Sequence, residues 1–102
     1  MGGNVARPST DSVIQDYRRR IDEIDRGIVE ALHRRVELVK EFKAYKETQG
    51  FDFLDAAREE RVLAQWSGEG GPASPEGLRE MGRTILEWTK REVARGGSPA
   101  SE

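Results

Sequence analysis

The sequence has 102 residues, which is enough for one small domain, and it contains no Cys. Disulfides, thiolate metal sites and a catalytic thiol are therefore excluded. No apolar run approaches the ~20 residues of a membrane span, and residues 1–10 lack the apolar stretch of a secretory signal, so we expect a cytoplasmic protein without a membrane partner. The 17 Lys and Arg residues against 19 Asp and Glu residues leave a net charge of -2, which provides no global field for nucleic acid. Any binding by basic residues must therefore come from local clusters rather than from the overall charge.

A heptad pattern marks the first expected element. Positions between residues 14 and 45 follow one another in alternating steps of three and four, which is the repeat of a helix that packs along one side. We call these positions the heptad face: Ile14, Tyr17, Ile21, Ile24, Ile28, Ala31, Arg35, Leu38, Phe42 and Tyr45. The pattern predicts one long helix over about 12–48, with Asp11 or Ser12 as its cap and Gly50 as its left-handed stop.

A helix of this length cannot be covered by its own chain. At 1.5 Å per residue it is roughly 55 Å long, whereas a compact domain of about 100 residues has a radius of gyration of only ~13 Å. Apolar residues make up 35% of the chain and charged residues another 35%, so the chain buries a thin core. We therefore expect the heptad face to continue onto a second copy of the chain.

Two shorter helices are expected after the long one. Residues 55–66 predict a three-turn helix capped by Asp55. Its apolar side is predicted to consist of Ala57, Val62 or Leu63, and Trp66. Gly-rich residues 67–72 break regular structure, and Ser74 and Pro75 open a third helix that ends near residue 95. Its packed stripe is predicted to be Leu78, Met81, Ile85 and Trp88.

These elements predict an all-α fold with three helices per chain, long, short and medium, whose heptad face packs against a second copy of the chain. No strand pattern and no internal repeat is visible. We expect the helical domain to span residues 11–95, between a disordered N-terminal segment, residues 1–10, and a disordered C-terminal tail, residues 96–102.

Arg35 is the charged member of the heptad face, and a guanidinium there needs an anion or contact with water. One interpretation is structural: Arg35 pairs with a Glu of another helix and fixes the register of a coiled coil. The other is an anion-binding pocket inside the bundle. Lys46 lies eleven residues later, which returns it to nearly the same face about 16 Å further along the helix. Arg35 and Lys46 could close on a small anion between them.

Arg18 lies about 25 Å from Arg35 along the same helix, which is too far for both to hold one small ligand within one chain. If Arg18 joins the pocket, it arrives from the partner subunit. The alternative is that residues 18–20 form a solvated run of charge. A nucleic-acid patch is disfavoured, because no aromatic residues interleave with the basic ones.

Asp55, Arg58 and Glu59 stand together at the start of the second expected helix. A capping Asp with an intrahelical ion pair explains this grouping, and so does a site in which Glu59 and free backbone N–H groups bind a polar ligand. His33 lies off the heptad face and is interpreted as a solvated surface residue rather than a catalytic base, because no metal-ligand or triad spacing accompanies it.

Over about residues 14–94 the sequence resembles the small all-helical chorismate mutases. The resemblance is carried by an ordered set of residues: Arg18, Ile21-Asp22-Glu23-Ile24-Asp25, Leu32-His33-Arg34-Arg35, Lys46 and Asp55-Ala56-Ala57-Arg58-Glu59. It implies an intertwined homodimer with two equivalent sites that convert chorismate to prephenate, on the branch toward Phe and Tyr. It implies no metal and no cofactor.

The resemblance also assigns roles to residues. Arg35, Lys46 and Glu59 become the candidate catalytic residues. Arg35, together with Arg18 contributed in trans, would grip the two carboxylates of chorismate through bidentate hydrogen bonds. Lys46 would bind a carboxylate and the ether oxygen, on which negative charge grows as the C–O bond breaks.

The remaining substrate-binding candidates come from the second and third expected helices. Arg58 would support the ring carboxylate, Glu59 and the backbone of Asp55 would take the ring hydroxyl, and Thr89 stands where the family often has Ser. Val93 departs from the family, which has a Gln or Glu there that helps to contact the ether oxygen. Since loss of one such donor typically removes ~3 kcal/mol of transition-state stabilisation, we expect a slow mutase when the protein acts alone. Some members are activated by docking on the first enzyme of the shikimate pathway, so an activating partner is possible here.

Three alternatives stay open. Residues 21–46 and 85–88 also resemble isochorismate pyruvate lyases, and a mutase of 4-amino-4-deoxychorismate has the same fold. The pair Arg58-Glu59 favours chorismate over both. In the third alternative the helices form a non-catalytic dimerisation module whose cations merely solvate the bundle.

Overall fold

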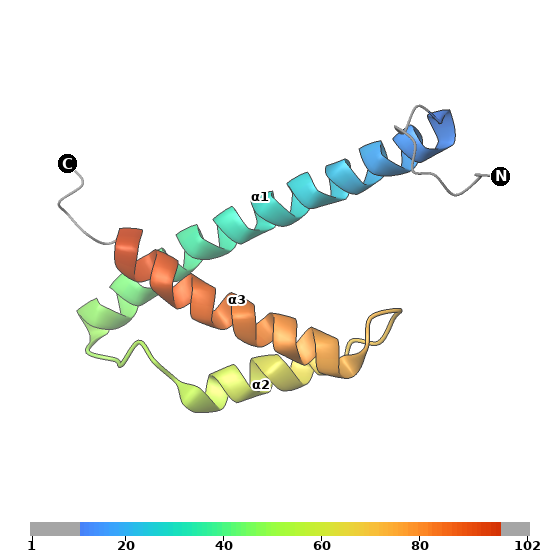
Figure 1. The fold of residues 1–102 in the computed structure, drawn as a ribbon. Coiled ribbons are helices and arrows are strands. Elements are labelled where there is room, and N and C mark those ends of the chain that lie inside the picture. The colour runs from blue at the N-terminus through green and yellow to red at the C-terminus, as the bar shows by residue number, and fades with distance from the viewer. Residues whose placement is uncertain (1–10, 97–102) are drawn as a thin grey trace. The chain divides into compact units, whose positions relative to one another are not determined.

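The structure is a computed structural model that describes residues 11–96, and these residues form three helices joined by two loops (Figure 1). The helices are α1 (Ser12–Gln49), α2 (Ala56–Ser67) and α3 (Pro75–Gly96). The predicted all-α class and the order long, short, medium are confirmed. The predicted disordered segments, 1–10 and 96–102, lie outside the described residues except for Gly96, which is the last residue of α3. Among residues 11–96, no helix has the length and apolar character needed to cross a bilayer.

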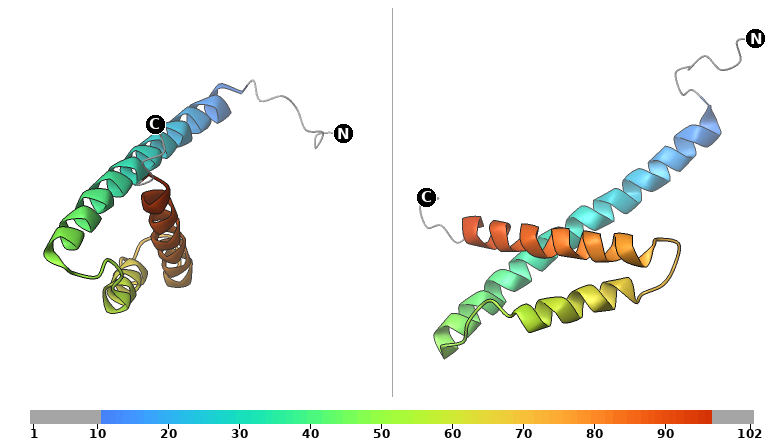
Figure 2. Two further views of the ribbon diagram at one scale, coloured as in Figure 1. Left: turned by 90° about the vertical axis from the view of Figure 1, so that its left-hand side faces the viewer. Right: turned by 60° about the horizontal axis from the view of Figure 1, so that its bottom comes forward.

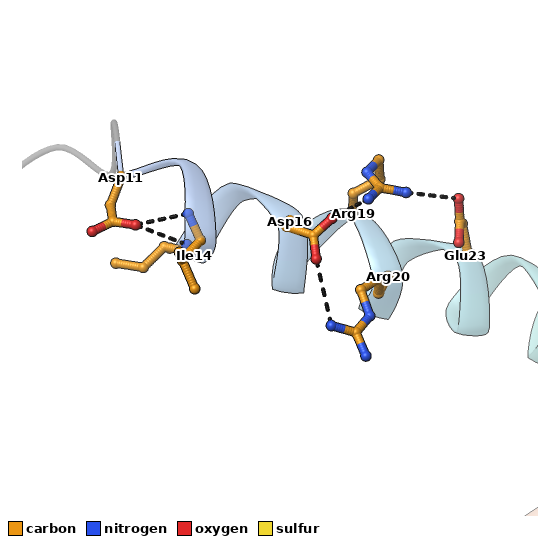
Figure 3. Close-up of polar contacts among 7 residues, drawn as sticks. Asp11, Ile14, Asp16, Arg19, Arg20 and Glu23 are labelled. Atoms are coloured by element: carbon orange, nitrogen blue, oxygen red, sulfur yellow. Dashed lines mark hydrogen bonds and ion pairs between the residues drawn. The ribbon is translucent and has the colours of Figure 1, made fainter.

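Both ends of α1 follow from local chemistry. The Asp11 carboxylate accepts hydrogen bonds from the backbone N–H groups of Val13 at 2.7 Å and Ile14 at 3.3 Å, and so caps the first turn (Figure 3). At the other end Gly50 has a φ of 78°, a conformation that suits Gly because it has no Cβ. The predicted cap and stop are confirmed, and the helix extends one residue beyond the predicted end.

The described chain divides into two compact units, and the boundary falls within α1 between His33 and Arg34. In the first unit, ion pairs along the surface of α1 join Asp16 to Arg19 and Arg20, and Arg19 to Glu23 at 3.5 Å (Figure 3). These pairs follow the i, i+3 and i, i+4 spacing of a helix surface and are exposed, so each contributes little to stability.

In the second unit, α2 and α3 lie side by side and run in opposite directions (Figure 2). A glycine lets these helices approach. A Cβ placed on Gly82 would come within 3.2 Å of the side chains of Leu63 and Trp66, closer than ordinary van der Waals contact. Leu63 is only 5% exposed, and Val93 on α3 is 3% exposed. Leu63 and Val93 are thus the buried apolar side chains of residues 11–96.

Two predicted packing positions are exposed in the single chain. Met81 was expected in the packed stripe of α3, but its side chain is 53% exposed, while the neighbouring Gly82 is buried. Ala57 was expected on the apolar side of α2 and is also exposed. The prediction for α3 selected large apolar residues, whereas the tight contact requires a residue without a side chain. A shift of one position turns the buried stripe by about 100° around the helix.

The heptad face of α1 is exposed in the single chain. Its large apolar side chains are 42–65% exposed: Ile14, Tyr17, Ile21, Ile24, Ile28, Leu38, Phe42 and Tyr45. Exposed apolar side chains repeated along a whole helix are typical of a surface that another protein chain covers.

Candidate functional site

An open cavity of about 350 Å³ lies in the second unit, and residues of α1, α2, α3 and the loop between α1 and α2 line it. This volume lies within the range of small-molecule sites. The lining is rich in charge, with five cationic and two acidic side chains: Arg35, Lys46, Arg58, Arg61, Lys90, Asp55 and Glu59. Apolar side chains from the three helices and the loop complete it.

Arg35 is held in the cavity by α3. One guanidinium nitrogen donates a hydrogen bond to the hydroxyl oxygen of Thr89 at 2.6 Å, and Thr89 is only 2% exposed. Burial lowers the pKa of Arg35, and the nearby positive charge of Arg58 lowers it further. Within residues 11–96 no acid pairs with Arg35, so the Glu pairing of the structural interpretation is not found in this part of the chain. Two cations without an acid between them favour an anionic ligand.

Lys46 is positioned by the turn that ends α1. Its ammonium nitrogen donates to the backbone carbonyl of Phe53 at 3.1 Å and lies 5.0 Å from the ring centroid of Phe42. The chain reaches this carbonyl because Gly50 reverses its direction directly after the helix. Lys46 is therefore fixed at the edge of the cavity by a neutral acceptor and an aromatic ring, and its charge can still act on an anion.

The start of α2 places two further charged side chains at the cavity. The Asp55 carboxylate accepts a hydrogen bond from the backbone N–H of Arg58 at 3.0 Å, and the backbone carbonyl of Asp55 accepts one from the backbone N–H of Glu59 at 3.0 Å. Asp55 is thus the cap that was predicted. Within residues 11–96 no ion pair joins Asp55 to Arg58, and both Arg58 and Glu59 line the cavity from the first turn.

Lys90 is a cavity residue that sequence analysis missed. Its ammonium nitrogen lies 3.2 Å from one carboxylate oxygen of Glu59 and 3.3 Å from a carboxylate oxygen of Glu87. Burial lowers the pKa of Lys90, but the hydrogen bonds and charges of both glutamates outweigh it, so the pKa is raised above 10.5. The sequence offered no signal for it, because Lys90 lies 31 residues after Glu59 and on another helix.

The structure brings most of the predicted site residues together, and two of them lie elsewhere. Val93 is buried but does not line the cavity. Arg18 belongs to the first unit, where it is exposed and, within the described part of the chain, forms no ion pair. His33, which was not expected in the site, is exposed on α1, as predicted for a solvated histidine.

Comparisons with known proteins give a consistent result. The family model described as chorismate mutase type II matches residues 17–93. Form I of a chorismate mutase from Thermus thermophilus has 30% sequence identity and a TM-score of 0.73, and the match covers 76% of this chain and 99% of that one. For form II the identity is 29%, the TM-score 0.76, and the coverage 82% of this chain and 97% of that one. Comparison with curated protein sequences gave no significant match.

Proposed function

The chain belongs to the chorismate mutase type II family, and from this membership and the cavity we propose that it rearranges chorismate to prephenate. The observation that carries the proposal is the convergence of Arg35, Lys46 and Arg58 on one cavity of about 350 Å³. Chorismate is a dianion, and such a cluster supplies charge and bidentate hydrogen bonds for two carboxylates. The lowered pKa of Arg35, caused by burial and by Arg58, supports an anion as the missing partner.

In the proposed reaction a C–O bond breaks and a C–C bond forms within one molecule, so no group of the protein needs to attack the substrate. The protein contributes in two ways. Arg35 holds the flexible dianion in its compact reactive conformer, which removes much of the entropic barrier. Lys46 stabilises the negative charge that grows on the ether oxygen. Both side chains are already oriented by hydrogen bonds, to Thr89 and to the carbonyl of Phe53 respectively, which is the preorganisation that such stabilisation requires.

We assign the start of α2 to the substrate ring. Arg58 supports the ring carboxylate, while the Glu59 carboxylate and the backbone of Asp55 take the ring hydroxyl. Both acidic groups lie at the cavity and are spaced by one turn of α2. Thr89 contributes by orienting the guanidinium of Arg35. Val93 does not line the cavity. For this position we propose that a longer Gln or Glu side chain would extend to the ether oxygen, whereas Val supplies no hydrogen-bond donor there, and that this absence lowers the rate.

We propose that the protein works as an intertwined homodimer in which Arg18 of each chain completes the site of the other. The exposed heptad face supports this arrangement, because large apolar side chains along the length of α1 lose contact with water when two copies pair. Arg18 supports it as well. Its neighbours Arg19 and Arg20 are engaged by Asp16, whereas Arg18 forms no ion pair within the described residues.

Mixing two inactive variants tests the shared site. Arg18→Ala and Arg35→Ala homodimers should both lose activity. After unfolding and refolding together in equal amounts, the mixed dimers contain one intact site each, so about a quarter of the wild-type activity per site returns. If both variants are inactive and no activity returns although mixed dimers form, Arg18 does not act in trans.

The proposed activity is tested by product identification. The purified chain is incubated separately with chorismate and with isochorismate, and the products are resolved by NMR. Prephenate from chorismate, abolished in Arg35→Ala while the helical CD spectrum survives, is the expected result. Pyruvate and salicylate from isochorismate, with little prephenate from chorismate, would instead establish a lyase. No turnover of either compound, alone or with the first shikimate-pathway enzyme of the same organism, would reject catalysis in favour of the dimerisation module.

Two further proposals concern the setting of the reaction. An activating partner from the shikimate pathway fits a site that lacks a donor at Val93, because docking on another enzyme can improve a slow site. A cytoplasmic location agrees with a substrate made by enzymes of that pathway, and it stays a prediction from the sequence.

A further inference from the structure

Glu59 is the acid of the cavity whose carboxylate is not occupied by a helix cap, and it is held by Lys90. Both oxygens of the Glu59 carboxylate lie close to the Lys90 ammonium, at 3.2 and 3.3 Å, and the two side chains are about equally shielded, 30% and 29% exposed. Lys90 also contacts Glu87, whose side chain is 56% exposed. A ligand group that reaches Glu59 therefore also meets the positive charge of Lys90.

We propose that Lys90 is a specificity-determining residue, which makes the Glu59 end of the cavity accept a neutral hydroxyl and reject a positively charged amine. The proposal rests on the proposed function, because it concerns the ring substituent that Glu59 binds in that reaction. It extends that function by naming a residue that chooses between two substrates of nearly equal shape, chorismate and 4-amino-4-deoxychorismate.

The argument compares what each substituent gains at Glu59. A hydroxyl donates one hydrogen bond to the carboxylate and carries no charge, so the nearby ammonium of Lys90 does not oppose it. A protonated amine would form a stronger, charge-assisted bond with an isolated carboxylate. Lys90 removes this advantage, because the carboxylate is already paired and two ammonium groups at one carboxylate repel each other. At a separation of about 5 Å and an effective dielectric constant of about 50, between that of a protein surface and that of water, this repulsion amounts to roughly tenfold in affinity.

Two features keep Lys90 suited to this role. The glutamates raise its pKa above the ordinary value despite the opposing effect of burial, so the side chain stays charged at every physiological pH. Glu87, three residues earlier on α3, contacts the ammonium from outside the cavity lining and helps to hold it at Glu59. The charge of Lys90 is therefore a fixed part of the cavity, because it neither titrates nor depends on Glu59 alone for its position.

The test measures a ratio of specificity constants, kcat/KM for 4-amino-4-deoxychorismate divided by kcat/KM for chorismate. It is measured for the wild-type dimer and for Lys90→Met, Lys90→Gln and Lys90→Arg. The matched control is Lys40→Met, which removes a charge from an exposed lysine that does not line the cavity. We expect the ratio to rise about tenfold in Lys90→Met and Lys90→Gln, which corresponds to ~1.4 kcal/mol, and to stay near the wild-type value in Lys90→Arg and Lys40→Met.

The outcomes separate the specificity role from the proposed function. If wild type converts chorismate and the ratio changes by less than twofold in both uncharged variants, the specificity role is wrong while the proposed function stands. The specificity role is also wrong if both substrates lose equal activity, because Lys90 then only supports the site in general. If wild type converts neither compound, the proposed function itself fails. Lys90→Gln retains a hydrogen-bond donor to Glu59, so it keeps the test decisive if Lys90→Met does not fold.

Discussion

Replacing Arg35 by Met should change the stability of the fold little and the activity of the cavity greatly. The substitution removes the charge-assisted hydrogen bond to Thr89, a loss of about 1.5–3 kcal/mol. It also removes a partly buried cation that lies beside Arg58 and has no acidic partner within residues 11–96. Replacing an ionic group in such a place by a packed apolar one is often neutral, or stabilising by about 1–4 kcal/mol. The two effects have similar size and opposite sign.

We therefore expect the Tm of Arg35→Met to lie within about 8 °C of the wild-type value, which corresponds to about 1 kcal/mol for a domain of this size. The effect on the substrate is much larger. A bidentate arginine donates two charge-assisted hydrogen bonds of about 1.5–3 kcal/mol each, so its loss removes about 3–6 kcal/mol. At ~1.4 kcal/mol per factor of ten, kcat/KM should fall roughly 10² to 10⁴-fold.

The assay combines steady-state kinetics on chorismate with thermal unfolding, with and without a non-reacting dianionic analogue. Wild type should show a rise in Tm with the analogue, and Arg35→Met should show none. Arg34→Met is the matched control, because Arg34 is its exposed neighbour on α1 and does not line the cavity. A variant of Arg35 that retains more than a third of wild-type kcat/KM, or an unchanged response to the analogue, would refute the anion pocket.

Three further predictions follow from single residues. Val93→Gln should raise kcat up to about 100-fold, because the longer amide side chain can reach the ether oxygen, and an unchanged kcat in steady-state kinetics would contradict this. The same substitution should lower the unfolding free energy, measured in urea, by about 1–3 kcal/mol, because Val93 is 3% exposed. Gly27→Ala should stabilise the protein by about 1 kcal/mol, because a Cβ there meets no atom within 4 Å. Gly82→Ala should stabilise it less, because a Cβ there meets Leu63 and Trp66 at 3.2 Å, and equal Tm shifts of the two variants would contradict this packing. Burial lowers the pKa of Lys90, but its two glutamate partners raise it by more, so the stability that these ion pairs contribute is present below pH 10.5 and is lost as the pH rises further. The difference in unfolding free energy between wild type and Lys90→Met, measured in urea, should therefore be constant from pH 7 to 10, and a decline within that range would contradict the assignment.

The helices could be predicted from the sequence because each boundary has a local cause. Asp11 and Asp55 are followed by helical residues whose free N–H groups they satisfy, and Gly50 adopts the positive φ that ends α1. The packing of α3 was less predictable. Its stripe was read from large apolar side chains, yet the close approach to Trp66 occurs at Gly82, a position that contributes to burial by lacking a side chain. A hydrophobic pattern contains no information about where a small residue is required.

The cavity shows the same division between local and long-range information. Arg35 and Lys46 lie on one helix, so the 3.6-residue period was enough to relate them. Lys90 lies 31 residues after Glu59 on another helix, and no period connects the two. The family resemblance did not supply Lys90 either, since no matching motif contained it. The contact appears only when α2 and α3 are placed side by side.

The net charge of the chain does not reveal that the cavity is cationic, because the two acidic side chains at the cavity contact other groups of the protein. The Asp55 carboxylate accepts a backbone hydrogen bond at the start of α2, and the Glu59 carboxylate is paired with Lys90. Within residues 11–96 no ion pair joins Arg35, Lys46 or Arg58 to an acid, so their charge is left for a ligand. A dianion reduces the repulsion between these cations, whereas a neutral ligand of the same shape leaves it in place. We therefore expect the cavity to prefer a doubly charged substrate, even in a protein with a net charge of -2, because these three cations have no acidic partner within residues 11–96.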